Sequence, residues 1–265
     1  MRPPIKLRWI YTLLVVFLAL FSVQMGLFVA RQMEGGGLGV ALWTSIVFDL
    51  IIGYTLIRAI WRITAQAYLS RKSHQLFRSR KHDKLTKRLN YKYSNLGTDI
   101  IVVRDEAFVA LAIGMRKPII VISTQVLNMF SDDEVKAILL HECHHCRNRD
   151  TLKLFVMTLL TEAFGYWPIM KPIFRYYQTW TELLADRFAI RQMGTELYLA
   201  SVLLKLSKQI KTQHAAAVHF AASTMHYRML QVLEPHQTVK VKIALLRPLL
   251  ASLTLLLLLM MGGDT

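Results

Sequence analysis

The residues with the clearest capacity for chemistry are two histidines and a glutamate in the pattern His-Glu-x-x-His. They are His141, Glu142 and His145, within the segment ILLHECHHCRNRD. Residues four apart lie on one face of a helix, about one turn apart, so the two imidazoles can bind one metal ion. A glutamate between them can take a proton from a water bound to that metal. The pattern predicts a zinc site with Glu142 as the general base.

A third metal ligand is predicted in a second helix, which includes 180–188 and continues to an end near Gly194. Glu182 and Asp186 are four residues apart, on one face of that helix. Acids on a helix surface are common, but these two lie in an apolar segment of a basic chain. Glutamate is a known third zinc ligand, and a ligating histidine usually donates its other ring N–H to a carboxylate. We predict Glu182 as the ligand and Asp186 as the carboxylate that orients a histidine.

The helix that carries the motif has a clear start. Ser131 and Glu134 form a capping-box pattern directly before an apolar periodic run. The sequence therefore predicts a helix from about Asp132 to about Arg147.

The remaining side chains of the motif are predicted not to bind the metal. At 100° per residue, Cys143 and Cys146 share an arc with the apolar residues of the helix, away from His141 and His145. Both cysteines are therefore expected in the core. His144 lies to the other side of His141 and is expected to be a neighbour of the site rather than a ligand.

Short strands are predicted before the motif, over 99–105, 107–113 and 119–123, because these segments are rich in β-branched and aromatic residues. A turn is predicted over 114–118. Together they suggest a small antiparallel sheet. After the motif, 195–211 is predicted to be an amphipathic helix and 212–222 a loop.

Apolar content indicates a membrane protein. Hydrophobic residues make up 54% of the 265 residues, and Trp9–Ala30 contains no charge. That run is long enough for a spanning helix of roughly 20 residues, and too long for the core of a typical signal peptide. Further spans are predicted over Val40–Ile60 and Pro248–Met261. The segment 152–174 is either a third membrane element or an interfacial hairpin.

The net charge of +16 is concentrated after the first two apolar runs. Residues 58–92 contain eleven lysines or arginines and one acid, Asp83. Such a segment is typical of the cytoplasmic side of a membrane. The simplest interpretation of this basic segment is that it sets the membrane topology and contacts lipid headgroups. No nucleic-acid partner is expected, because the segment lacks a recognised binding motif.

The features around the motif resemble a known family. The chain is similar to the BlaR/MecR-type antirepressor integral membrane zinc metallopeptidases, and to the related HtpX-type and CAAX-prenyl membrane proteases. The segments that carry the resemblance lie between about Ala107 and Pro235 and are FVALAIGMRKPIIVIS, SDDEVKAILLHECHHCRNRD, ELLADRFAI and HYRMLQVLEP.

The resemblance implies a mainly α membrane protein, with transmembrane helices around a gluzincin (zincin-like) α+β metalloprotease domain. It implies four parts: a transmembrane hairpin over 1–64, a basic cytoplasmic linker over 65–98, a protease domain over 99–240 and a C-terminal transmembrane helix over 241–265. The protease domain would be cytoplasmic and the C-terminus outside. Relatives also carry an extracellular sensor domain after the last helix, and none is expected here.

The resemblance also implies roles for individual residues. Zinc (Zn²⁺) would be held by His141, His145 and Glu182, with Asp186 and Asp150 behind the ligands. A basic residue near the oxyanion would be His226 or Arg228. The edge strand that receives substrate would contain Ile119, Ile120, Val121 and Ile122.

The predicted function is therefore cleavage of a protein or peptide substrate at the cytoplasmic face of the plasma membrane, for example of a transcriptional repressor. Two alternatives stay open. One is a quality-control protease of the HtpX type, and the other is a non-catalytic membrane sensor or scaffold. The predicted partners are the substrate and the lipid bilayer, and a homo-oligomer is compatible with these features.

Overall fold

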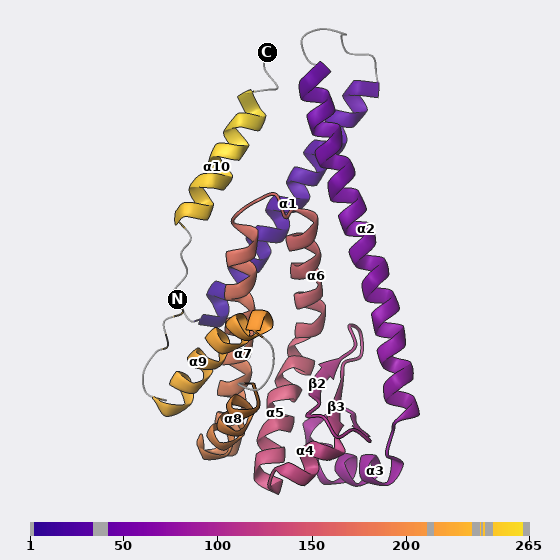
Figure 1. The fold of residues 1–265 in the computed structure, drawn as a ribbon, viewed down its shortest axis with the longest axis vertical. Coiled ribbons are helices and arrows are strands. Elements are labelled where there is room, and N and C mark those ends of the chain that lie inside the picture. The colour runs from indigo at the N-terminus through magenta and orange to yellow at the C-terminus, as the bar shows by residue number, and fades with distance from the viewer. Residues whose placement is uncertain are drawn as a thin grey trace. The chain divides into compact units, whose positions relative to one another are not determined.

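The computed structural model describes residues 3–33, 42–210, 215–234, 239, 241 and 246–261. The predicted outer tail after Met261 lies outside these residues. Figure 1 labels the elements along the chain. The helices are α1 (Pro3–Met33), α2 (Leu42–Ser79), α3 (Asp83–Lys92), η1 (Ser94–Leu96), α4 (Thr124–Met129), α5 (Asp132–Asn148), α6 (Asp150–Ala163), α7 (Met170–Met193), α8 (Leu197–Ile210), α9 (Ala215–Leu233) and α10 (Leu246–Met261). The strands are β1 (Ile100–Val103), β2 (Ala110–Ile113) and β3 (Ile119–Ser123).

The chain divides into two compact units. Unit 1 comprises 1–66, 156–177 and 243–265, and unit 2 comprises 67–155 and 178–242. Unit 2 contains the sheet and the His-Glu-x-x-His motif. The mainly helical fold with one small sheet agrees with that part of the predicted fold class.

Unit 1 is helical and is held together by aromatic and charged contacts between helices. Phe21 of α1 packs edge-on against Phe164 and Trp167. Glu162 of α6 lies 3.6 Å from Arg58 and 3.5 Å from Arg62, both on α2. These contacts join segments that are far apart in the sequence.

The membrane spans predicted over 9–30, 40–60 and 248–261 are not confirmed. Among the described residues, no helix is both long enough and apolar enough to cross a bilayer. Within that part of the chain, α10 has 16 residues, fewer than the roughly 20 that a span needs. The second half of α2 carries many of the basic residues of 58–92.

Helix α5 begins as the sequence predicts. The Ser131 hydroxyl accepts a hydrogen bond from the Glu134 backbone N–H, and the Glu134 carboxylate accepts one from the Ser131 N–H. The helix ends at Asn148, and the left-handed backbone of Arg149 (φ 52°) turns the chain directly into α6. This tight turn places the start of α6 beside the last turn of α5.

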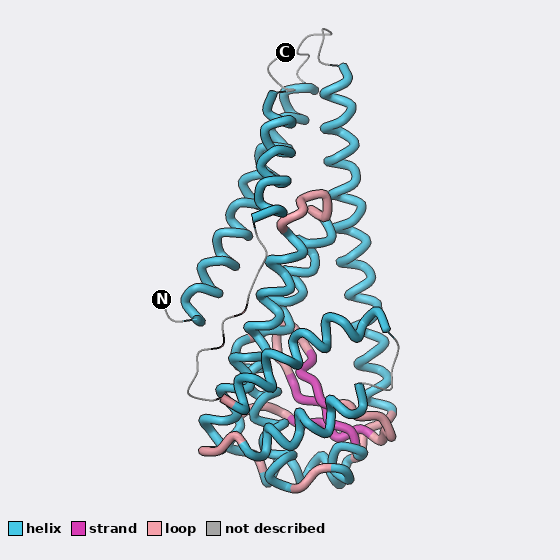
Figure 2. The backbone as a smooth tube through the Cα atoms, turned by 60° about the vertical axis from the view of Figure 1, so that its left-hand side comes forward, coloured by secondary structure: helices cyan, strands magenta, loops and turns pink. Residues whose placement is uncertain are grey.

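The three strands, magenta in Figure 2, form one sheet in the order β1-β3-β2. β2 is antiparallel to β3, as predicted, through a turn in which Gly114 adopts φ +98°. β1 is parallel to β3, so the prediction of an antiparallel sheet is wrong for this strand. Strand direction depends on where the connections run, and local sequence does not contain that information.

Helix α3 closes the outer edge of β1. The Asn90 side chain accepts a hydrogen bond from the Ile100 N–H and donates one to the Ile100 carbonyl. Next along the strand, Val102 donates to the Thr86 hydroxyl and accepts from the His82 N–H. An unpaired strand edge normally invites another strand, and these contacts block that edge here.

The core of unit 2 lies between the sheet and α5. Its members share near-complete burial and include Val102, Ile120, Ile122, Leu139 and Cys143. The segment 212–222 was predicted to be a loop, but its described part, 215–222, belongs to α9. Five of these eight residues are alanines, which have the highest helix propensity, and only His219 among them is polar.

We expect Glu134→Gln to destabilise unit 2 by about 1–3 kcal/mol at pH 7. Glu134 is buried, and its carboxylate accepts hydrogen bonds from the Lys205 ammonium at 2.8 Å and from the Ser201 hydroxyl. Burial alone would raise the pKa of Glu134, but Lys205 and Ser201 outweigh it and lower the pKa from the usual 4.5. The free energy of unfolding, measured with urea at several pH values, checks this prediction.

The sign of the pH dependence follows from the lowered pKa. The contribution of the Glu134 carboxylate is complete above pH 4.5 and is lost as the pH falls through the folded-state value. The difference between wild type and Glu134→Gln should therefore shrink in acid. Glu106→Gln, at an exposed position, is the control and should leave stability unchanged. A constant difference at all pH values would contradict the prediction.

Candidate functional site

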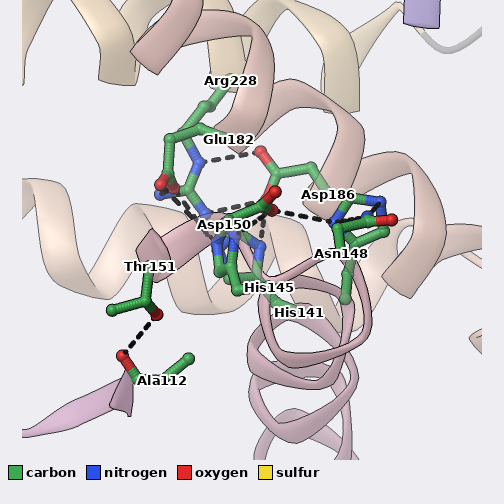
Figure 3. Close-up of polar contacts among 10 residues, drawn as sticks. Ala112, His141, His145, Asn148, Asp150, Thr151, Glu182, Asp186 and Arg228 are labelled. Atoms are coloured by element: carbon green, nitrogen blue, oxygen red, sulfur yellow. Dashed lines mark hydrogen bonds and ion pairs between the residues drawn. The ribbon is translucent and has the colours of Figure 1, made fainter. Parts of the chain in front are cut away.

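Residues from several helices of unit 2 converge at one place, shown in Figure 3. Helix α5 supplies both histidines of the motif, α7 supplies two acids, α6 one acid and α9 an arginine. These residues are His141, His145, Glu182, Asp186, Asp150 and Arg228.

The two imidazoles are oriented by carboxylates on their outer nitrogens. His145 Nδ1 donates to Asp150 Oδ2 at 3.0 Å, and His141 Nδ1 lies 2.9 Å from Asp186 Oδ1. The His141 contact is close, but its geometry does not meet the criteria for a hydrogen bond. A carboxylate at Nδ1 holds a proton on that nitrogen, so Nε2 is the ring nitrogen that a metal ion would bind, in exchange for any proton there.

The Nε2 atoms of the two histidines face each other and the Glu182 carboxylate. The two Nε2 atoms are 3.1 Å apart. Glu182 Oε2 lies 3.3 Å from His141 Nε2, and the other carboxylate oxygen, Oε1, lies 3.6 Å from His145 Nε2. Tetrahedral zinc, with bonds of about 2.0–2.1 Å, separates its ligand atoms by about 3.3 Å. The three donors therefore fit a zinc ion, and their chemistry, two imidazoles and one carboxylate, suits it.

Charge balance around His141 favours a cation. Burial and the nearby Arg228 guanidinium would lower the pKa of His141, but the contacts with Asp186 and Glu182 outweigh them and raise it to about 10. The Glu182 and Asp186 carboxylates keep lowered pKa values, because contact with His141 and Arg228 overcomes their burial. Both acids are therefore anionic at neutral pH and can offset a bound divalent ion.

Arg228 holds the two acids of α7. Its Nε and Nη2 each donate to an Asp186 oxygen at 2.8 Å, and its Nη1 lies 3.1 Å from Glu182 Oε2. The two-point contact holds Asp186, which is fully buried, and Arg228 reaches the same Glu182 oxygen that faces His141. Arg228 was predicted as a basic residue near the oxyanion, and the structure places its guanidinium against Asp186 and Glu182.

Glu142 is the remaining polar residue of the motif. It is buried and lines the same cavity as His141 and His145. Burial raises the pKa of Glu142, and the neighbouring histidines oppose that rise. A carboxylate with a raised pKa is a better proton acceptor at neutral pH, as a general base requires.

A cavity of about 420 Å³ opens onto these groups. One wall carries the motif, Asp150, Glu182 and Arg228. The rest is largely apolar, from strand β2 and its flank and from α5, α6 and α8: Phe108, Ala110, Leu111, Ala112, Ile138, Thr151, Leu154, Leu199, Val202 and Leu206. A polypeptide segment placed here would reach the candidate metal donors from the side of β2.

The cysteines and the third histidine of the motif lie where the helical periodicity placed them. Cys143 and Cys146 are buried in the core, and burial raises the pKa of the Cys146 thiol to about 12. His144, His145 and Asp150 form a second possible metal-binding group. In it, however, the His145 Nδ1 is already engaged by Asp150, and the His144 ring contacts Asn148. The group formed by His141, His145 and Glu182 therefore fits a metal ion better than the group formed by His144, His145 and Asp150.

Two predictions about site residues are wrong. His226 is exposed and does not line the cavity, since a step of two residues from Arg228 turns it about 200° around α9. Ile119–Ile122 cannot form a substrate-receiving edge, because β3 is paired on both sides. The free strand beside the cavity is β2. No sequence pattern pointed to Thr151, whose hydroxyl donates to the Ala112 carbonyl at 3.4 Å.

Comparison with known proteins shows which family the chain belongs to. The profile of the family described as BlaR1 peptidase M56 matches residues 29–232, well over half of the chain. The chain belongs to this family. The resemblance inferred from the sequence is thereby confirmed.

Individual relatives match shorter segments. Regulatory protein BlaR1 of Bacillus licheniformis is 29% identical over 122 residues, which is 44% of this chain and 20% of the relative. Regulatory protein BlaR1 of Staphylococcus aureus is 26% identical over 150 residues, 56% of this chain and 25% of the relative. A protease HtpX homolog of Methanopyrus kandleri is 29% identical over 110 residues, 39% of this chain and 35% of the relative. The chain thus spans between about a fifth and a third of these relatives.

Proposed function

We propose that the protein is a zinc-dependent endopeptidase anchored in a membrane. The observation that carries the proposal is the convergence of His141 Nε2, His145 Nε2 and Glu182 within 3.6 Å of one another, with Glu142 on the same cavity. Membership of a peptidase family supports the same conclusion.

The residues of this chain divide the chemistry among them. A zinc ion held by His141, His145 and Glu182 would supply Lewis acidity at the scissile carbonyl. Glu142 takes a proton from the attacking water and delivers it to the leaving amine. Asp150 and Asp186 keep the imidazoles in the ligating tautomer, and Arg228 holds Asp186 and Glu182 in place.

The substrate in this proposal is an extended protein segment that adds to β2. The free edge of β2 lies on the cavity. A strand edge binds the main chain of an added segment, so substrates of many different sequences can bind there. Two relatives are named regulatory proteins, which favours a regulatory substrate such as a transcriptional repressor. Similarity to a protease HtpX homolog keeps membrane-protein quality control as a second candidate.

A bilayer and a cytoplasmic site are further parts of the proposal. The apolar runs near both ends of the chain support contact with lipid. Large apolar side chains on α2 are also exposed, including Leu50, Ile57 and Trp61. The basic residues of 58–92 favour the cytoplasmic side for the protease domain after them.

Metal removal tests the proposal directly. The purified protein in detergent should cleave unfolded β-casein, lose that activity in 1,10-phenanthroline, and regain it when zinc is added back. Product peptides identified by mass spectrometry provide the measurement. Cleavage that persists after the metal content has fallen to background would contradict the proposal.

A further inference from the structure

The sheet of unit 2 has two edges, and they differ in availability. Helix α3 occupies the hydrogen-bonding groups of β1 through Asn90, Thr86 and His82. The other edge belongs to β2, which is half-buried along its length and borders the cavity. A new strand can therefore join this sheet only beside β2.

The register of β2 identifies its outward-facing groups. The Val109 carbonyl accepts a hydrogen bond from the Ser123 N–H at 2.8 Å, and Leu111 stands opposite Val121. In an antiparallel ladder the backbone groups of successive residues alternate between the two sides. The N–H and C=O groups of Ala110 and Ala112 therefore point to the free edge.

One of these four outward groups is already occupied. The Thr151 hydroxyl donates a hydrogen bond to the Ala112 carbonyl at 3.4 Å, as Figure 3 shows. Within the described residues, the other outward groups of Ala110 and Ala112 have no protein hydrogen-bond partner. A carbonyl oxygen can accept two hydrogen bonds, but the Thr151 side chain stands at this one. An added strand thus finds an unobstructed pair of groups at Ala110, and at Ala112 a free N–H beside a carbonyl that Thr151 obstructs.

The position of Thr151 is tied to the metal-binding histidine. Thr151 follows Asp150, which accepts the hydrogen bond from His145 Nδ1. Both residues stand at the start of α6, directly after the left-handed turn at Arg149. The first turn of α6 therefore contacts both the free edge of β2 and His145.

We propose that Thr151 is a positioning residue that sets the register of the substrate strand on β2. This inference rests on the proposed peptidase function. Thr151 stops the added strand at Ala112, so the strand pairs through Ala110 and presents one peptide bond to Glu142 and the metal-binding groups. A one-residue slip would turn every substrate side chain to the opposite face, so the alternative register differs by two residues. That slip moves the substrate by about 7 Å, beyond the reach of the site for the original bond.

Thr151→Val provides the test, since it removes the hydroxyl and keeps the branched shape. The full-length zinc-loaded protein digests unfolded β-casein, and mass spectrometry maps the cuts. The variant should produce additional cuts two residues away from wild-type cuts, because the freed Ala112 carbonyl can accept from substrate. Its kcat/KM at the original cuts should fall by about 3–10-fold, the effect of one hydrogen bond.

Matched variants separate this role from a general structural one. Thr151→Ser restores the hydroxyl and should restore the wild-type map. Thr161→Val, in the same helix, removes a hydroxyl that bonds only to the Met157 carbonyl of its own helix, and should leave the map unchanged. Zinc content should be equal in all of these proteins.

Each other outcome overturns the inference. An unchanged map for Thr151→Val would reject the register role while leaving the peptidase function intact. Loss of zinc or of the folded state in Thr151→Val would assign the hydroxyl a structural role instead. A zinc-loaded wild type that makes no cuts would reject the peptidase function and the register role with it.

Discussion

Glu142→Gln should retain zinc and lose cleavage by about 10²–10⁴-fold, the range that a general base contributes. Glutamine matches glutamate in shape, so the cavity and the three metal donors keep their positions. Its neutral amide cannot accept the proton of the attacking water. The burial that raises the pKa of Glu142 makes the wild-type carboxylate a good proton acceptor near neutral pH, and the amide removes that property.

The measurement combines zinc by elemental analysis with the rate of β-casein cleavage. Glu106→Gln makes the same chemical change at an exposed position outside the cavity and should leave both quantities unchanged. In cells, proteomics of strains with wild type and Glu142→Gln should show a fragment only with wild type. Wild-type cleavage by Glu142→Gln would reject the base assignment, and loss of zinc would show that Glu142 supports the metal site instead.

The parts of the site that the sequence predicted are those encoded within one helix. The capping box at Ser131 fixes where α5 starts, and the helical period then determines that His141 and His145 share a face and Cys143 faces the core. Glu182 was found because a pair of acids four residues apart is unusual in an apolar segment of a basic chain. In each case the signal is local and its geometry is set by 3.6 residues per turn.

The parts that the sequence missed depend on contacts between distant segments. The order β1-β3-β2 makes β3 central, so this largely apolar and buried strand is the least available to substrate. A nearly continuous apolar run is typical of a buried, central strand, and this pattern argues against Ile119–Ile122 as an edge. The Thr151 contact with Ala112 and the Arg228 contact with Asp186 join residues 39 and 42 positions apart, and no local pattern encodes them.

Glu182→Ala should remove the third metal donor and lower zinc affinity by at least about 100-fold, leaving little zinc on the purified protein. The two histidines alone would provide an incomplete set of donors for a tetrahedral ion. The fold should persist, because Arg228 keeps both of its hydrogen bonds to Asp186, so metal loss and unfolding are separable.

Elemental analysis and thermal unfolding together check this prediction. A ligand that binds the folded state raises Tm, so zinc should raise the Tm of the wild type and not that of Glu182→Ala. Glu182→Gln, which keeps the shape but removes the charge, should behave like Glu182→Ala because a neutral amide is a poor zinc ligand. Glu196→Ala, at an exposed position before α8, is the control and should bind zinc as the wild type does. Full zinc occupancy in Glu182→Ala would mean that another group completes the site. Asp150 would be the first to examine, because it belongs to the second group of potential donors around His145.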